Sequence, residues 1–223
     1  MTDLPEFAPF PKISRLFRPF VVTEKIDGTN ASVHVLEDGR VLAASRTRWI
    51  TPEADNHGFA RWVEEHEEEL RVGLGVGSHY GEWWGSGIQR RYGLKEKRFS
   101  LFNTARWGDD AVRPACCHVV PVLYDTVALQ VSLDSGEIAA AAPSAFPGLP
   151  EIDPSGTHVL VHNMAGIGLE GALRRLRTQG SVAAPGFMRP EGVVIFHAAS
   201  STLFKVTLEG DEAPKLGAKR TPA

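Results

Sequence analysis

Hydrophobic and polar residues alternate along several short segments, which is typical of strands that bury one face. We expect a strand at 20–23, a second at 31–37 and an antiparallel return at 40–45, with Asp38-Gly39 as the hairpin turn between them. Further strands are predicted at 77–84, 99–103, 118–125, 192–197 and 202–207. Because neighbouring segments come in pairs, the pattern favours antiparallel sheets.

Two segments instead repeat apolar residues at helical spacing. The first runs from about 55 to 72 with its acids largely on the opposite side, and the second covers 169–177. His66 is expected at a helix boundary, or as a histidine with satisfied hydrogen bonds, and not as a metal ligand. Paired strands with two or three interspersed helices predict an α+β fold of antiparallel sheets flanked by helices.

The chain of 223 residues is long enough for one large domain, and we expect a single domain over 1–223. A stretch rich in Ala, Pro, Ser and Gly at 132–157 predicts a loop or insertion. Residues 209–223 are predicted to form a polar tail, with no appended OB-type or other C-terminal domain.

The formal net charge of −3 gives no global sign of nucleic-acid binding, so any such surface must be a local basic patch. Such a patch is predicted at Arg90, Arg91, Lys95, Lys97 and Arg98. The two cysteines, Cys116 and Cys117, are adjacent, which argues against a disulfide framework and a zinc site. No signal peptide or membrane-spanning run is visible, so we expect a cytoplasmic protein without membrane contact.

The segment with the strongest chemical signal is a lysine followed by an Asp-Gly turn, Lys25-Ile26-Asp27-Gly28. A lysine at the end of a strand projects from a fixed backbone toward whatever the turn holds, as a nucleophile requires. Gly28 allows close backbone approach, and Asn30 offers hydrogen bonds. Taken alone the motif is weak, because a strand running into a turn with a solvated lysine would look the same.

Five further motifs follow in the chain. They are Ser45-Arg46-Thr47, the segment from Tyr80-Gly81-Glu82 through Gly87-Ile88-Gln89, Phe99-Ser100-Leu101-Phe102, Glu191-Gly192, and Phe204-Lys205. With the lysine turn, this series resembles the covalent nucleotidyltransferases, the superfamily of polynucleotide ligases and mRNA capping enzymes. The segment ending in Gly-Ile-Gln is most similar to ATP-dependent RNA ligases of the RNA ligase 2 type. The resemblance covers about 18–207 and implies the ligase and capping-enzyme type of nucleotidyltransferase fold.

The resemblance also implies roles for single residues. Lys25 would attack the α-phosphate of ATP and store AMP as a phosphoramidate, with Glu191 and Lys205 as further catalytic residues. Glu191 would hold a divalent cation directly or through water, and we expect Mg²⁺, with Mn²⁺ able to substitute. The residues expected to bind the nucleotide are Glu24 near the adenine edge, Lys25, Asp27, Gly28, Asn30, Arg46, Glu82 at the ribose, Phe102 on the adenine face, and Lys205.

The expected activity is sealing of an RNA 5′-phosphate to a 3′-hydroxyl, at a nick in a duplex, without a stable protein partner. A DNA-nick ligase or a capping-type enzyme on the same fold stays open, as does a noncatalytic nucleotide or RNA binder. Two positions depart from the family pattern: Thr207 stands where a second lysine is usual, and Asn103 where an acid commonly follows the stacking aromatic.

Overall fold

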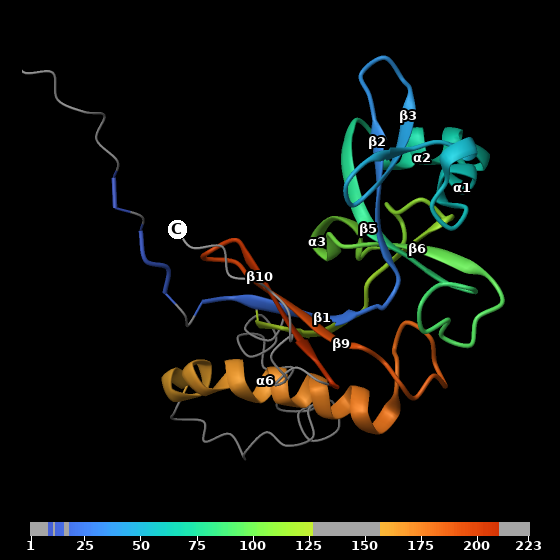
Figure 1. The fold of residues 1–223 in the computed structure, drawn as a ribbon. Helices are drawn as coiled ribbons and strands as arrows, with labels where there is room; N and C mark the ends of the chain where they lie inside the picture. Colours follow the sequence, from blue (N-terminus) through green and yellow to red (C-terminus); the bar gives the residue numbers. More distant parts are fainter. Residues whose placement is uncertain (1–8, 11, 16–17, 127–156, 210–223) are drawn as a thin grey trace, which may run out of the picture.

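A computed structural model describes residues 9–10, 12–15, 18–126 and 157–209. Of the loop expected at 132–157 and the tail expected at 209–223, all but the first residue of α6 (Thr157–Gln179) and Glu209 lies outside the described residues. In this part of the chain, two sheets meet near the lysine turn (Figure 1). None of its helices has the length and apolar character needed to cross a membrane.

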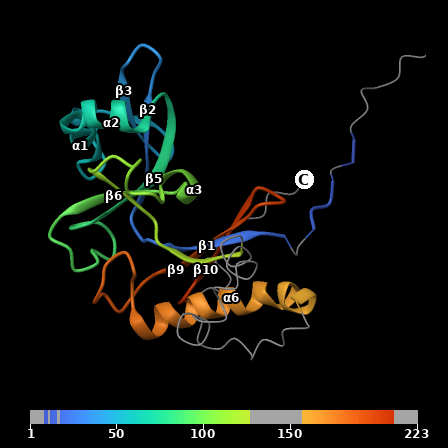
Figure 2. The same cartoon turned by 180° about the vertical axis from the view of Figure 1, so that it is seen from behind.

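The smaller sheet has four strands in the order β10-β9-β1-β8. They are β1 (Phe20–Lys25), β8 (Val122–Asp125), β9 (Gly192–His197) and β10 (Thr202–Thr207), all antiparallel. Alternation along β1 buries Phe20, Val22 and Glu24 on one face, where the helix α6 (Thr157–Gln179) packs through Ala172 and Leu176. The same alternation places Lys25 on the opposite face of β1, and α6 covers only one face of this sheet (Figures 1 and 2).

The larger sheet has six strands in the order β4-β3-β2-β5-β6-β7. They are β2 (Thr29–Val35), β3 (Val41–Ser45), β4 (Trp49–Ile50), β5 (Gly77–Gly85), β6 (Lys97–Leu101) and β7 (Cys117–Val119). The expected antiparallel pairing is confirmed except between β6 and β7, which are parallel. The hairpin turn at Asp38-Gly39 is also confirmed, since the Leu36 N–H donates to the Arg40 carbonyl across it.

The helices α1 (Phe59–Glu65) and α2 (Glu67–Leu74) cover one face of the six-stranded sheet, next to a short 3-10 turn at Pro52–Ala54. Their apolar residues pack against Val33, Val35 and Phe99 in the largest buried cluster. The predicted helical segment is divided between these two helices, because the backbone at His66 leaves helical geometry. The helix boundary expected at His66 is confirmed. A further short helix, α3 (Thr104–Trp107), follows β6.

The prediction of a single strand over 118–125 was also wrong. Its first half, β7, belongs to the six-stranded sheet and its second half, β8, to the four-stranded sheet. The break falls at Val120 and Pro121, and proline has no N–H with which to continue a ladder. The carbonyl of Pro121 accepts a hydrogen bond from the Glu24 backbone N–H, so the crossing chain is fixed beside the lysine turn.

Candidate active site

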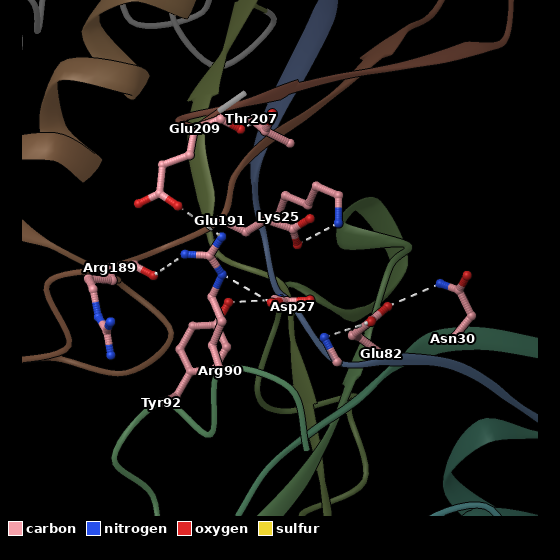
Figure 3. Close-up of polar contacts among 11 residues, drawn as sticks. Lys25, Asp27, Asn30, Glu82, Arg90, Tyr92, Arg189, Glu191, Thr207 and Glu209 are labelled. Atoms are coloured by element: carbon pink, nitrogen blue, oxygen red, sulfur yellow. Dashed lines mark hydrogen bonds and ion pairs between the residues drawn. The ribbon is translucent and has the colours of Figure 1, made fainter. Parts of the chain in front are cut away.

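Lys25 is the last residue of β1 and faces a carboxylate at the start of the neighbouring strand (Figure 3). It pairs in register with Gly192, the first residue of β9, and Glu191 directly precedes that strand. The Lys25 Nζ lies 2.5 Å from Glu191 Oε2, and the two side chains are 22 % and 17 % exposed. The amine and the carboxylate are therefore held together by backbone pairing and remain accessible to a ligand.

The turn after Lys25 lies hard against β5. A Cβ atom at Gly28 would stand 2.5 Å from the Trp83 carbonyl oxygen and 2.7 Å from Trp84 Cβ, closer than packed atoms approach. Only glycine fits here without displacing the backbone. The Gly28 N–H donates to Glu82 Oε1 over 3.0 Å, which connects the lysine turn to the six-stranded sheet.

Glu82 has both carboxylate oxygens engaged, since Oε2 accepts a 3.0 Å hydrogen bond from Asn30 Nδ2. The residue is buried, with 8 % exposure. Burial raises the pKa of Glu82 to about 7, against the opposing effect of the nearby Lys25 charge and the hydrogen bond from Gly28. Glu82 therefore changes its protonation state near neutral pH, and only its ionised form is purely a hydrogen-bond acceptor.

Arg90 joins the lysine turn to two other segments. Its Nε lies 3.0 Å from Asp27 Oδ2, its Nη1 donates to the Arg189 carbonyl over 3.1 Å, and its Nη2 is 3.7 Å from Glu209 Oε2. The Asp27 N–H donates to the Tyr92 hydroxyl over 2.7 Å. The expected RNA contact of Arg90 stays a prediction, but its guanidinium is already engaged in positioning the turn.

The other predicted basic residues divide into two groups. Arg98 is paired with Glu96, and Lys97 donates to the His57 carbonyl over 2.7 Å. Arg91 and Lys95 are exposed, and no described carboxylate forms an ion pair with either. The basic residues most free to meet a phosphate are thus fewer than the charge pattern suggests.

A hollow of about 370 Å³ lies next to this arginine network. Its lining residues are Gln89, Arg90, Arg91, Phe187 and Arg189. Three of these residues are arginines and none is acidic, and although Arg90 is already paired with Asp27, such a lining suits an anionic group. Sequence reasoning missed Arg189, although its place two residues before Glu191 was a usable signal.

Glu24 is 1 % exposed and faces away from Lys25, on the α6 side of β1. Its oxygens accept hydrogen bonds from Ser181 Oγ at 2.5 Å, Val182 N at 2.7 Å and Ala183 N at 2.9 Å. Burial raises the pKa of Glu24, and these hydrogen bonds oppose that shift. Glu24 therefore holds the 181–183 loop beside the site. Its expected contact with the adenine edge stays a prediction, and the loop was missed from sequence.

Lys205 lies on the same face as Lys25. In β10 it pairs with Val194, which pairs on its other side with Thr23, two residues before the nucleophile candidate. Thr207 pairs with Gly192, so it lies in line with Lys25 at the position where the family pattern has a lysine. At this position β10 therefore has a hydroxyl side chain instead of a second positively charged one.

Arg46 and Phe102 both follow strands of the larger sheet. Arg46 comes directly after β3 and is exposed. Phe102 comes directly after β6, is 42 % exposed, and its N–H donates to the Tyr80 carbonyl over 3.0 Å. An aromatic ring with that exposure is free to stack on a planar ligand.

The carboxylates near Lys25 suit a divalent cation that takes most of its ligands from the phosphates of a bound nucleotide. Within the described residues, no three His, Cys, Asp or Glu side chains converge as a ready-made metal site. Mg²⁺ in phosphate-transfer sites commonly takes one or two carboxylates and completes its shell with waters and phosphate oxygens. Glu191, partly exposed next to Lys25, is a suitable carboxylate for such an ion.

A nucleophilic amine with carboxylates on either side is suited to covalent group transfer. Lys25 provides the amine, Glu191 and Glu82 are the neighbouring acids, and Lys205 adds positive charge on the same face. Burying charged groups costs stability, so several of them gathered at one half-exposed place are typical of a functional site.

Comparison with solved structures gives matches among RNA ligases of Naegleria gruberi. One variant with AMP and Mn is 16 % identical with a TM-score of 0.49, and an apo variant is 17 % identical with a TM-score of 0.46. Each match covers 86 % of this chain and 50 % of the other chain, so this chain spans about half the length of those ligases. A comparison with curated proteins gave no match.

Comparison with protein families is decisive on family membership. The RNA ligase family profile matches residues 18–207, which include both sheets and all the candidate site residues. The mixed α+β architecture with largely antiparallel sheets agrees with this assignment. On the strength of that match over most of its length, the chain belongs to the RNA ligase family.

Proposed function

We propose that this protein is an ATP-dependent RNA ligase that works through a covalent Lys25–AMP intermediate. The observation that carries the proposal is the pair of Lys25 Nζ and Glu191 Oε2, 2.5 Å apart beside a glycine turn that no larger residue could make. Membership of the RNA ligase family supports the choice of substrate.

The first step transfers AMP to the enzyme. Lys25 Nζ loses a proton and its lone pair attacks the α-phosphorus, forming the P–N bond while the bond to the pyrophosphate oxygen breaks. Glu191 is the nearest acceptor for that proton, and its contact with Nζ also orients the amine toward the phosphate. Lys205 offsets negative charge that develops on the α-phosphate from the same face of the sheet.

The nucleotide is held by residues of the larger sheet. Glu82 in its ionised form accepts hydrogen bonds from the ribose hydroxyls, and Phe102 stacks on the adenine. Asn30 keeps the Glu82 carboxylate in place, and Arg46 contacts the sugar or a phosphate. A bound Mg²⁺ or Mn²⁺, held by Glu191, would neutralise the phosphates and stabilise the pyrophosphate as it leaves.

The later steps use the stored AMP. The RNA 5′-phosphate takes AMP from Lys25, which breaks the P–N bond and returns the amine, and the 3′-hydroxyl then attacks the activated phosphate and releases AMP. The hollow lined by Arg90, Arg91 and Arg189 suits one of the RNA phosphates. The nick in a duplex that the sequence favours is one substrate form, and RNA with unpaired ends is the other.

The experiment is incubation with α-labelled ATP or GTP and a divalent cation, followed by denaturing electrophoresis and by sealing of 5′-phosphorylated RNA. We expect label on the protein from ATP and much less from GTP, and sealed RNA. Lys25→Ala and Lys25→Arg should both be folded and unlabelled, because arginine offers no deprotonated nitrogen. The exposed Lys95→Ala is the matched control and should label normally. Labelling of Lys25→Ala would remove Lys25 from the mechanism.

Preferential labelling by GTP would favour a capping-type enzyme, and sealing of DNA nicks in preference to RNA would favour a DNA ligase. Nucleotide binding without any adduct would favour a noncatalytic binder.

A further inference from the structure

A group of exposed aromatic side chains lies on the six-stranded sheet, on the face opposite α1 and α2. Trp49 pairs in register with Ala44, Ala44 with Ser32, and Ser32 with Tyr80, so these side chains form one line across four strands. Trp49 is 58 % exposed and Tyr80 60 % exposed. Such large exposed aromatic surface on one face is typical of a binding site.

His34 joins the two aromatic residues into one cluster. Its ring centroid lies 4.7 Å from that of Trp49 and 6.1 Å from that of Tyr80, both in edge-to-face geometry. Its Nε2 is hydrogen-bonded to Ser32 Oγ at 2.9 Å and its Nδ1 to Ser78 Oγ at 2.8 Å. These hydrogen bonds fix the His34 ring, against which both other rings lie edge to face; Trp49, His34 and Tyr80 together are the aromatic cluster.

The aromatic cluster is continuous with the candidate active site. Asn30 and Glu82, which pair in register, lie on the same face of β2 and β5, two residues from Ser32 and Tyr80. Phe102, which we expect to stack on the adenine, is hydrogen-bonded through its backbone to Tyr80. From Phe102 the cluster extends away across the sheet, and three strand spacings, about 14 Å, separate β5 from β4.

The charge around the aromatic cluster suits a polyanion. Arg46 and Arg48 occupy the connection between β3 and β4, beside Trp49, and are exposed. Neither forms an ion pair with a described carboxylate. Small residues, Ala44 and Ser32, occupy the positions between Trp49 and Tyr80, which leaves the aromatic rings standing above the sheet.

We infer that the aromatic cluster binds unpaired bases of the RNA substrate next to the end that is joined. Aromatic rings stack on the faces of bases, and those faces are accessible only where the bases are unpaired and unstacked. Arg48, which is not assigned to the nucleotide, would meet a phosphate of the same strand. This inference rests on the proposed ligase function and refines its substrate, because it favours single-stranded RNA ends over a continuous nicked duplex.

The test is equilibrium binding of a fluorescent, 5′-phosphorylated single-stranded RNA to the full chain without ATP, compared with the same strand in a nicked duplex. Trp49→Ala and Tyr80→Ala should each weaken single-strand binding by about 5- to 100-fold, the effect of losing one base-stacking ring. Trp49→Phe and Tyr80→Phe keep a ring and should bind nearly as the wild type does. Val72→Ala, at an exposed position on α2, is the control and should change nothing.

Lys25–AMP formation is measured on the same variants and should be unchanged, with RNA sealing reduced at subsaturating RNA. Wild-type RNA affinity in both alanine variants would overturn the inference. So would loss of adduct formation, which would assign the cluster to ATP, or an equal loss of duplex binding. A concentration-dependent change in molecular mass that the alanine variants abolish would instead make this face a contact between copies of the chain. Absence of any adduct or sealing in the wild type would contradict the proposed function itself, and is thereby distinguished from failure of this inference.

Discussion

The two sheets of this protein differ in what they present around the lysine turn. The four-stranded sheet brings charged groups together, with Lys25, Glu191 and Lys205 on or beside one face. The six-stranded sheet presents Glu82 and exposed aromatic rings instead, among them Tyr80 and Phe102. The four-stranded sheet thus provides groups suited to phosphate chemistry, and the six-stranded sheet provides groups suited to binding bases and sugar.

The difference shows how the fold divides the work of the proposed reaction. Reacting groups lie on strands whose backbone pairing fixes them, whereas ligand-binding rings lie where they can make contact without moving the nucleophile. The 3.0 Å hydrogen bond from Gly28 to Glu82 is one of several contacts where the two sheets meet. Variants that affect only one sheet should therefore separate chemistry from substrate binding.

The largest effect in a variant that keeps the nucleophile is expected for Glu191→Gln on the four-stranded sheet. Removal of this charge takes away the proton acceptor next to Lys25 and the expected metal ligand, so adduct formation should fall by about 100-fold or more even at saturating ATP. Single-turnover labelling measures it, and partial recovery with Mn²⁺ would support the metal role. The exposed Glu68→Gln is the control, and an unchanged rate in Glu191→Gln would refute the assignment.

Glu82 should make nucleotide binding depend on pH. Its pKa is raised to about 7, so between pH 8 and pH 6 its ionised fraction falls about tenfold, and affinity for AMP should fall by a similar factor. Titration calorimetry at several pH values measures this. Glu82→Gln has no proton to exchange and should bind more weakly but with a flat profile. A wild-type profile that is equally flat would show that Glu82 does not contact the nucleotide.

Ionisation of Glu82 should have the opposite effect on folding: as the pH rises, nucleotide affinity increases but folding stability decreases. A carboxyl whose folded pKa lies above the ordinary value of 4.5 holds its proton more tightly in the folded state. Its burial cost is therefore fully present above about pH 7 and disappears as the pH falls toward 4.5. Thermal unfolding of the wild type and Glu82→Gln is measured at pH 8 and pH 5.5. The difference in melting temperature between the two proteins should be smaller at pH 5.5.

The smallest effects should separate Arg90 from Arg91. Arg90→Ala breaks the contacts with Asp27 and the Arg189 carbonyl, so adduct formation and sealing should both fall, by about tenfold. Arg91→Ala should leave the adduct unchanged, weaken RNA binding, and make the slope of log affinity against log salt shallower by about 1. If adduct formation is affected equally in the two variants, Arg90 has no separate role in positioning the lysine turn.

Much of the fold could be predicted from local signals. The strands at 192–197 and 202–207 have the predicted bounds, and the hairpin at Asp38-Gly39 follows from its turn residues. The strand division at Pro121 was missed because the apolar pattern continues through it while the chain passes from one sheet to the other. Alternation shows which residues lie on one face but not which sheet a strand joins.

The site was predictable as a set of residues and less so as a set of contacts. Lys25 and Glu191 were both expected, but their pairing depends on strands 166 positions apart. The Glu24 contacts with the 181–183 loop and the Asp27 contact with Arg90 were invisible for the same reason. The aromatic cluster was missed because Trp49 lies on a two-residue strand whose neighbours depend on sheet order.

The central claim, that Lys25 carries AMP on its way to RNA, is tested most directly by mapping and chasing the adduct. The protein is labelled with ATP, digested and analysed by peptide mass spectrometry, and a second sample is chased with 5′-phosphorylated RNA. We expect AMP on the peptide that contains Lys25 and its transfer to the RNA 5′ end during the chase. AMP on another residue, or an adduct that RNA does not remove, would contradict it.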